Sequence, residues 1–320
     1  MTIKSKTLVT FALIAYNQEE YIGDAIQGAL SQDYENLEVI LSDDCSGDET
    51  LNIIESMVKG YSGSHKIVIN KNSENKGLSS HFNKIMELAS GEIIVVAAGD
   101  DISLSNRVSN TVKAFNEDPD VMLVSFKDHI IDRHGKKIKE NLCTDYRKYD
   151  VLTLEDFLAG RRLPTSGASR GLRYSLYKQF GPLSEECPTE DTPYKMRGLI
   201  MGKALVFHAP GILCRKHDFN LSGPNRINKM DFDAISNQYI VDFEQARKNK
   251  LLTKDPTNKY MEMINKDKAK RQVQQEIHEG NLTLFGYLAK VFFKSGYSFR
   301  EKAYLGRQVA QKYTSKYKSN

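Results

Sequence analysis

The sequence contains little that could form covalent cross-links or a thiolate metal site. Its four cysteines, Cys45, Cys143, Cys187 and Cys214, lie far apart among the 320 residues and form no CxxC pair. Neither a zinc site nor a disulfide framework is therefore expected. A chain with this cysteine usage is typical of a reducing cytoplasm, and we expect it there.

Long apolar runs are also missing. No run approaches the roughly 18 residues that a membrane-spanning helix needs. Residues 7–16 follow Lys4 and Lys6 and have the length of a secretory signal core. They lack a small-residue cleavage site, however, and continue into the polar run Asn17-Gln18-Glu19-Glu20. We expect residues 8–15 to form a first buried strand.

The chain has no GxGxxG segment after any expected strand, no internal repeat and no low-complexity segment. The missing glycine motif argues against a nucleotide-binding oxidoreductase. No RNA- or DNA-binding motif accompanies the basic residues, so a nucleic-acid binder is not expected either. Hydrophobic content of 40% and charged content of 27% are ordinary for a globular protein.

Charge is unevenly distributed. Residues 283–320 carry eight basic side chains and one acidic, a net charge of +7, whereas the whole chain carries +4 and the remainder therefore −3. A helix expected over 282–294 precedes most of these charges. Its apolar stripe consists of Leu284, Phe285, Leu288, Val291 and Phe292. The stripe either packs on the rest of the protein or enters a membrane interface, where the basic tail would meet anionic headgroups.

Strand and helix signals alternate in the first third of the chain. Apolar runs predict strands at 8–15, 37–41, 66–70 and 93–98, and amphipathic stripes predict helices at 18–32, about 48–59 and 79–89. This order predicts an α/β fold with a doubly wound, mostly parallel, Rossmann-like sheet.

The pattern changes after Asp101. Helices are expected at 104–115, 174–180 and 190–201, and strands at 121–126, 130–131, 204–208 and 211–214, with a hairpin turn at 132–135. Residues 137–170 are expected to be irregular, and the chain to be mostly helical beyond 224. We predict three parts: residues 1–104, residues 105–222 of mixed structure, and a helical C-terminal extension (223–320).

The apolar run 93–98 ends in Gly99-Asp100-Asp101. Open α/β sheets bind ligands just beyond the carboxyl ends of their strands. Two adjacent carboxylates there repel each other unless a cation or hydrogen-bond donors compensate. A hard divalent ion that takes carboxylate and phosphate oxygens meets this need, whereas the alternative is a solvated acidic turn.

Six segments in order resemble motifs of the inverting family-2 glycosyltransferases, particularly bacterial enzymes of surface-polysaccharide assembly. They are Ala12-Leu13-Ile14-Ala15-Tyr16-Asn17, Ser42-Asp43-Asp44-Cys45-Ser46, Asn75-Lys76-Gly77 with His81 and Asn83, Gly99-Asp100-Asp101, Glu190-Asp191, and Arg215-Lys216-His217. The resemblance covers residues 7–222 and implies the GT-A fold. It implies that residues 1–104 form the nucleotide-sugar-binding half and residues 105–222 the acceptor-binding and catalytic-base half.

The resemblance also implies how a donor is bound. The implied nucleotide-sugar-binding residues are Ala15, Tyr16, Asn17, Glu19, Asp43, Asp44, Ser46, Asn75, Lys76, Gly77, His81, Asn83, Gly99, Asp100, Asp101, Arg215 and Lys216. Asp44 is the first choice for reading a uracil or thymine base and Asp43 the second. Mn²⁺ or Mg²⁺ would be held by Asp100, Asp101 and His217. The family commonly has a further carboxylate two residues before Asp100, where this chain has Ala98.

Asp191 is the implied catalytic base and Glu190 its helper. A positioned carboxylate that takes a proton from an acceptor hydroxyl contributes about 10²–10⁴-fold to the rate. The alternative is that both acids stabilise a helix start behind Thr189. The expected activity is transfer from a nucleotide-sugar, preferably a UDP-sugar, to a saccharide or lipid-linked saccharide in capsule, O-antigen or similar synthesis. If the apolar stripe of the expected helix 282–294 enters a membrane interface, the protein would lie peripherally on the inner face of the plasma membrane. A degenerate carbohydrate-binding or scaffold protein is the alternative function.

Overall fold

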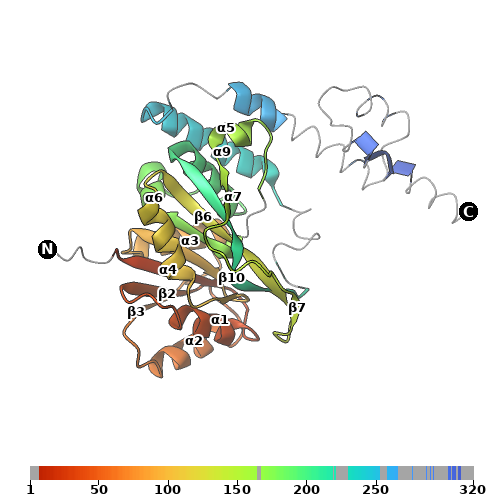
Figure 1. The fold of residues 1–320 in the computed structure, drawn as a ribbon. Helices are drawn as coiled ribbons and strands as arrows, with labels where there is room; N and C mark the ends of the chain where they lie inside the picture. The colour runs from red at the N-terminus through yellow and green to blue at the C-terminus, as the bar shows by residue number, and fades with distance from the viewer. Residues whose placement is uncertain are drawn as a thin grey trace, which may run out of the picture. The chain divides into compact units, whose positions relative to one another are not determined.

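The computed structural model describes residues 7–163, 167–218, 220, 230–252 and 258–265, with a few single residues and short pieces beyond 265. The chain divides into two compact units, Met1–Thr253 and Lys254–Asn320. The first unit contains the sheet and the helices discussed below (Figure 1). In the second unit residues 258–265 are helical.

A ten-stranded mixed sheet forms the centre of the first unit. Its strands are β1 (Val9–Ala15), β2 (Leu37–Asp43), β3 (Lys66–Lys71), β4 (Ile93–Ala98), β5 (Ile102–Ser103), β6 (Val121–Ile131), β7 (Lys137–Lys139), β8 (Tyr149–Leu152), β9 (Arg170–Arg173) and β10 (Lys203–Arg215). They are ordered β3-β2-β1-β4-β9-β6-β10-β5, with β7 on β6 and β8 on β10. β1 to β4 pair in parallel, and β9 runs antiparallel to both β4 and β6. The predicted α/β sheet is confirmed.

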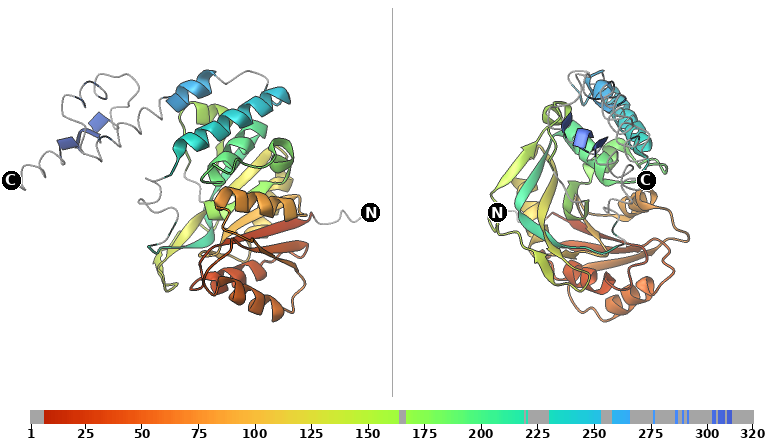
Figure 2. Two further views of the ribbon diagram at one scale, coloured as in Figure 1. Left: turned by 180° about the vertical axis from the view of Figure 1, so that it is seen from behind. Right: turned by 90° about the vertical axis from the view of Figure 1, so that its right-hand side faces the viewer.

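Helices cover both faces of the sheet (Figure 2). The helices are α1 (Ile22–Leu30), α2 (Thr50–Lys59), α3 (Leu78–Leu88), α4 (Arg107–Glu117), α5 (Leu154–Leu158), α6 (Ser175–Phe180), α7 (Asp191–Met201) and α9 (Phe232–Lys248). One apolar core joins the sheet to α1, α2 and α4, and a second joins it to α3, α6 and α7. The strands β1, apolar except for Thr10, and β4 are buried because both of their faces are covered.

The predicted boundaries were wrong in three places beyond β4. Residues 121–131 form one strand rather than two, and residues 203–215 also form one strand, in which register shifts replace the predicted break. The segment 137–170, predicted to be irregular, contains β7, β8, α5 and a short 3₁₀ turn at Gly167–Ser169. These strands are stabilised by pairing with β6 and β10, and an alternation count along one segment does not detect such partners.

The predicted helix 282–294 and most of the basic tail lie outside the described residues. Among the residues that are described, no helix is long and apolar enough to span a bilayer. The division into 1–104, 105–222 and 223–320 stays a prediction.

Candidate active site

The carboxyl ends of β1, β2 and β4 meet at one edge of the sheet. The parallel register places Ala15 opposite Asp43, and Ile14 opposite Ala98. The residues that follow these strands therefore lie side by side. The chain continues from β1 toward β2 on one side, and β4 pairs with β1 on the other. Ligands of open α/β sheets bind at such a switch point.

Two loops at this edge are joined into one unit. The Asn17 backbone N–H donates to Ser46 Oγ at 2.8 Å, and Asn17 Oδ1 accepts from the Gly47 N–H at 2.8 Å. The Glu19 carboxylate accepts from the Glu49 N–H at 3.0 Å. Asn17 (φ 51°) and Cys45 (φ 62°) both adopt the left-handed conformation, which is uncommon outside glycine and often marks functional sites. Exposed Tyr16 begins the first of these loops.

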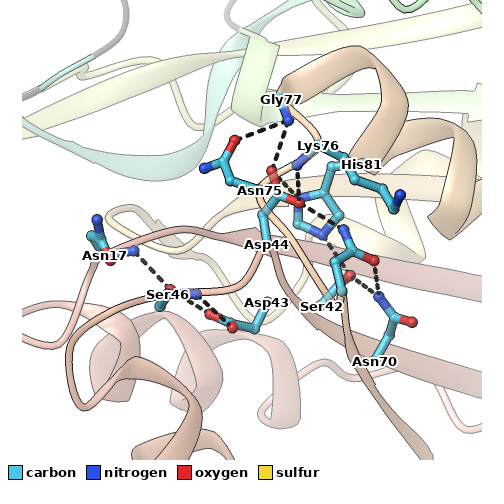
Figure 3. A network of polar contacts seen from close by, with 11 residues as sticks. Asn17, Ser42, Asp43, Asp44, Ser46, Asn70, Asn75, Lys76, Gly77 and His81 are labelled. Carbon is cyan, nitrogen blue, oxygen red and sulfur yellow. Dashed lines mark hydrogen bonds and ion pairs between the residues drawn. The ribbon is translucent and has the colours of Figure 1, made fainter.

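Asp43 and Asp44 are adjacent but serve different loops (Figure 3). The Asp44 carboxylate accepts from the backbone N–H groups of Lys76 and Gly77, both at 3.0 Å, and from Asn72 Nδ2 at 2.7 Å. The Asp43 carboxylate accepts from the backbone N–H and the hydroxyl of Ser46. Both acids are buried. Each carboxylate thus fixes a loop that borders the site.

The Asn75-Lys76-Gly77 turn is exposed and precedes α3. Asn75 Oδ1 accepts from the Gly77 N–H at 3.1 Å. Gly77 has φ 74°, a conformation that suits glycine because other residues are strained there.

His81 supports these loops from α3. Its Nε2 lies 2.6 Å from Ser42 Oγ, and its Nδ1 lies 3.9 Å from Asp44 Oδ2. Burial lowers the pKa of His81, although the charges of Asp44 and Asp43 act in the opposite direction. The imidazole is therefore neutral at pH 7. It contacts Ser42 at the end of β2 and lies near Asp44 in the loop that follows.

Asn83 connects the sheet edge to a distant segment. Its Nδ2 donates to the Leu183 carbonyl, and its Oδ1 accepts from the Leu183 N–H, both at 2.8 Å. Both polar atoms of this buried side chain thus have partners inside the protein. Asn83 thus holds the chain that leads to α7, and its role in nucleotide-sugar binding stays a prediction.

The acids after β4 also face different surroundings. Asp100 Oδ2 lies 3.0 Å from His217 Nε2 and accepts from Asn220 Nδ2 at 3.2 Å. Asp101 Oδ1 instead accepts from the Arg215 backbone N–H at 2.8 Å. Burial, with the charge of Asp100, raises the pKa of Asp101 to about 7. Asp101 therefore fixes the end of β10, and Asp100 is the acid whose carboxylate lies beside the His217 ring.

Gly99 allows the chain to turn between β4 and these acids. A Cβ at this position would lie 2.2 Å from Gln18 Oε1 and 3.2 Å from the Ala15 Cβ. A larger residue would therefore displace the Gln18 side chain and tighten the contact with the end of β1.

Arg215 and Lys216 differ in what they can offer a ligand. The Arg215 guanidinium is buried over the Tyr21 ring. It donates to the Asp100 carbonyl at 3.0 Å, to the Arg133 carbonyl at 3.1 Å and to Asp24 Oδ2 at 2.8 Å. Arg215 thus clips β10, α1 and the end of β4 together. Lys216 is exposed.

Glu190 and Asp191 begin α7 with a shared cation. Glu190 is buried in an ion pair with Arg170, which is buried too. Arg170 also donates to the Asp191 carbonyl at 3.0 Å and to the Gly167 carbonyl at 2.9 Å. Burial raises the pKa of Glu190 despite this cation.

Asp191 is held by two hydroxyls. Its Oδ1 accepts from Thr189 Oγ1 at 2.8 Å and from Thr192 Oγ1 at 2.7 Å. Burial alone would raise the pKa of Asp191, but the Arg170 charge and the two hydroxyls outweigh it, so the pKa lies below its usual value. The other oxygen, Oδ2, faces Gly167, where a Cβ would lie 3.4 Å away. At pH 7 this side chain is a carboxylate with one oxygen next to a glycine.

A second buried arginine ties this pair to the sheet. Arg107 donates to the carbonyls of Val96 and Arg170. β9 pairs with β4 from Arg173–Ile93 to Gly171–Val95, so Arg170 lies at the carboxyl end of β4. The Glu190–Asp191 pair is therefore anchored at the same sheet edge as Asp100.

The predictions from sequence did not include Arg170 or Arg107. The available signal was a charged residue in an apolar context, as in Ser169-Arg170-Gly171-Leu172. A buried guanidinium requires acceptors, so such a residue points to a nearby carboxylate or to free carbonyls.

Among the described residues, no group of three His, Cys, Asp or Glu side chains could hold a metal ion. Asp100 and His217 approach each other to 3.0 Å at this edge. Mg²⁺-type ions are commonly bound through one or two carboxylates with substrate phosphates and waters. A cation held partly by a diphosphate fits these two side chains, and one oxygen of the third predicted ligand, Asp101, is already bonded to the Arg215 N–H.

A family model described as glycosyl transferase family 2 matches residues 10–180, which is more than half of the chain. The chain belongs to this family. The predicted resemblance is confirmed, and a family-2 member is a transferase of glycosyl groups.

Curated relatives match shorter segments. EpsE of Bacillus subtilis is 38% identical over 97 residues, which is 30% of this chain and 34% of that protein. The UDP-Glc:alpha-D-GlcNAc-diphosphoundecaprenol beta-1,3-glucosyltransferase WfaP of Escherichia coli is 32% identical over 105 residues, which is 33% of this chain and 40% of that protein. The matched segments thus span less than half the length of either relative.

Solved structures resemble the chain over nearly its whole length. TarS 1–349 of S. aureus, in complex with UDP, has a TM-score of 0.56 at 16% identity and covers 96% of this chain and 89% of its own. The mannosyltransferase PcManGT from Pyrobaculum calidifontis, in complex with GDP-Man and Mn²⁺, has a TM-score of 0.56 at 15% identity, with coverage of 99% and 77%. The likeness establishes the GT-A fold.

Proposed function

We propose that this protein is an inverting glycosyltransferase that moves a sugar from a UDP-sugar to a hydroxyl of a saccharide or lipid-linked saccharide during surface-polysaccharide synthesis. One observation carries the proposal: the ionised Asp191 is anchored through Arg170 at the carboxyl end of β4. The same edge carries Asp100 and His217. A base and a diphosphate site on one sheet edge suit a direct displacement.

The donor would lie over the joined loops after β1 and β2. Tyr16 is 47% exposed there and offers a ring beside the base. The carboxylates of Asp43 and Asp44 each accept hydrogen bonds from within the protein, which pre-organises the loops around the nucleotide. The name of WfaP specifies UDP-Glc, and TarS was crystallised with UDP, which supports a uridine donor.

Asp100 and His217 would hold a divalent cation together with the donor diphosphate. When bound, such an ion stabilises the charge that develops on the leaving phosphate oxygens. The Mn²⁺ in the PcManGT complex supports this assignment. Lys216 is exposed beside these residues and would add a further positive charge for the phosphates. Arg215, whose donors go to Asp24 and to two carbonyls, positions β10 instead.

Asp191 would take the proton from the acceptor hydroxyl as the hydroxyl oxygen attacks the anomeric carbon. Oδ2 is the accepting atom, because Oδ1 already receives the hydroxyl hydrogens of Thr189 and Thr192. Attack from the face opposite the diphosphate inverts the anomeric centre in one displacement, so no covalent intermediate is required. Glu190 supports the base by holding Arg170.

A lipid-linked acceptor is supported by the name of WfaP, which specifies a diphosphoundecaprenol-linked acceptor. A cytoplasmic location with peripheral contact to the inner face of the plasma membrane stays a prediction.

A panel of UDP- and GDP-sugars, each with and without Mn²⁺, tests the proposal. A donor present at 100 times its Kd should raise the free energy of unfolding by about 2.7 kcal/mol, which a thermal shift detects. Transfer to an acceptor, with the anomeric configuration of the product read by NMR, then tests inversion. Donor binding without turnover on any saccharide would favour the carbohydrate-binding alternative, and retention of configuration would contradict the single displacement.

A further inference from the structure

The hairpin formed by β6 and β7 has a surface that the transfer reaction does not use. Residues 133–140 are all exposed, and the hairpin extends away from the body of the sheet (Figures 1 and 2). Two apolar side chains lie on it or just beyond it: Ile138, in β7, is 63% exposed, and Leu142, in the segment after β7, is 84% exposed. Leu142 is the most exposed large apolar side chain in the described part of the molecule.

Positive charge surrounds these apolar residues. Residues 133–142 contain four basic side chains and one acidic, a net charge of +3. Arg133 pairs with Glu20 at 3.5 Å, and Lys137 pairs with Glu140 at 2.7 Å. Within the described residues, Lys136 and Lys139 form no salt bridge and are exposed. Apolar tips flanked by free lysines match an anionic interface in both chemistry and charge.

The hairpin is rigid at its turn. Asp132 Oδ1 accepts from the N–H groups of His134 and Lys136, both at 2.9 Å, and the Gly135 N–H donates to the Asp132 carbonyl at 3.0 Å. A turn with these bonds presents Lys136 in a fixed place.

The turn is also fastened to the candidate active site. The Arg215 guanidinium donates to the Arg133 carbonyl and to the Asp100 carbonyl. One side chain thus spans from the hairpin to the acid beside His217. A surface that engages this hairpin would lie next to the place where the donor diphosphate is proposed to bind.

We propose that the β6–β7 hairpin docks on an anionic lipid surface, with Ile138 and Leu142 entering the interface and Lys136 and Lys139 meeting headgroup phosphates. This docking would bring a lipid-linked acceptor to the catalytic edge, and in that respect it rests on the proposed function. The docking element is distinct from residues 283–320, whose positive charge would act in addition.

A tryptophan reporter tests the proposal directly, because the chain contains no tryptophan. Ile138→Trp in the full-length protein should show a blue-shifted emission when vesicles of phosphatidylglycerol and phosphatidylcholine are added at low salt. Val241→Trp, at a 58% exposed position on α9, is the matched control and should show no shift. Equal emission at position 138 with and without vesicles would overturn the proposal, even if the protein binds vesicles through its tail.

Charge removal gives a second measurement. Lys136→Gln combined with Lys139→Gln should lower partitioning onto the anionic vesicles by about 20- to 30-fold, since each basic residue near such a surface contributes about fivefold. Lys84→Gln combined with Lys113→Gln removes the same charge elsewhere and should change partitioning little. Unchanged partitioning of the hairpin variant would contradict docking. A change in its self-association without vesicles would show that the hairpin binds a second copy instead.

The two proposals fail separately. Transfer to a water-soluble acceptor by a protein whose Ile138→Trp emission ignores vesicles would remove the docking and keep the transferase. Vesicle-dependent emission in a protein that transfers no sugar would do the reverse.

Discussion

Asp100–Asp101 and Glu190–Asp191 are two pairs of consecutive acids at the same sheet edge, and the environments of the two pairs differ. In each pair one acid is turned into the protein: Asp101 accepts from the Arg215 backbone, and Glu190 pairs with Arg170. The partner in each pair stands at the site. In the part of the chain that the structure describes, no arginine or lysine forms a salt bridge with Asp100 or Asp101, and the Arg215 guanidinium pairs with Asp24 instead. The second pair shares Arg170.

Burial raises the pKa of the inward acid in both pairs, Asp101 and Glu190, even though Arg170 pairs with Glu190. Burial and the neighbouring Asp100 raise the pKa of Asp101 to about 7, whereas Arg170 and two hydroxyls hold the pKa of Asp191 below its usual value against the effect of burial. Asp100 and Asp101, which form no salt bridge with an arginine or lysine in the described part of the chain, could be compensated by a bound cation. A pair that carries its cation provides a permanent carboxylate, which a general base requires.

Removing the cation of the second pair should have the largest effect on stability. Arg170→Met leaves the Glu190 carboxylate buried without its partner, which costs about 3–5 kcal/mol. Urea denaturation measures this loss. Arg170→Met combined with Glu190→Leu removes both charges and should recover most of it; a double variant as unstable as the single one would show that packing, and not charge, explains the loss.

A second buried ion pair provides the control for this experiment. Arg197 and Asp242 join α7 to α9 at 2.9 Å with both side chains buried. Arg197→Met should destabilise the protein to a similar degree. It should leave the pH dependence of turnover unchanged, since Arg197 does not contact Asp191.

A variant that loosens the segment before α7 should lower stability without changing donor affinity. Asn83→Ala leaves the N–H and carbonyl of buried Leu183 without partners, which costs about 1–3 kcal/mol. Calorimetry should show unchanged donor affinity, because the Asn83 amide is engaged inside the protein. A large loss of donor affinity in a folded Asn83→Ala protein would support its predicted role in nucleotide-sugar binding.

The metal dependence of donor binding tests the role of the first pair, Asp100 and Asp101. Asp100→Asn should weaken donor binding in Mn²⁺ by about tenfold or more, because it removes a charged ligand and leaves His217 without its carboxylate partner. Asp101→Asn is the comparison, and it should act mainly on stability through the Arg215 N–H. Undiminished activity of the wild type in excess chelator would contradict the metal assignment.

The smallest expected effect is a shift in pH dependence. A base with a lowered pKa stays ionised as the pH falls toward 3.8, the usual value for Asp, so protonation of Asp191 itself should not limit turnover above that pH. The stability that Asp191 contributes is likewise present above the unfolded pKa and lost below the folded one. In Arg170→Met with Glu190→Leu, the acidic limb of the rate profile should move to higher pH. An unmoved limb would show that Arg170 does not set the pKa of Asp191.

The sequence was sufficient for the first half of the fold because each element there carries its own pattern. β4 is a continuous apolar run, β1 is apolar except for Thr10, and α1 and α3 carry amphipathic stripes, so local periodicity and sheet position agree. β8 and β9 are short and contain polar residues, such as Asp150 and Arg170. Their pairing with β10, β4 and β6 stabilises them, and this pairing depends on residues far away in the sequence.

The sequence predicts where the candidate site lies, but it does not predict which acid of each pair faces the site and which faces the protein interior. Strand ends and motifs indicate that Asp100, Asp101, Glu190 and Asp191 gather at one edge. They do not indicate which acid of each pair turns inward, because that depends on donors such as the Arg215 N–H and on Arg170. Arg215 was predicted to clamp the diphosphate, and its partners Asp24 and the Arg133 carbonyl are separated from it by many residues.

The turnover of Asp191→Asn tests the central claim most directly. The amide keeps the size of the side chain and a carbonyl oxygen for Thr189 and Thr192, but it cannot accept the acceptor's proton. We predict that kcat falls by about 10²–10⁴-fold with donor affinity nearly unchanged, the pattern of an interaction made only in the transition state. A variant that retains more than about a tenth of wild-type turnover would contradict the assignment of Asp191 as the base.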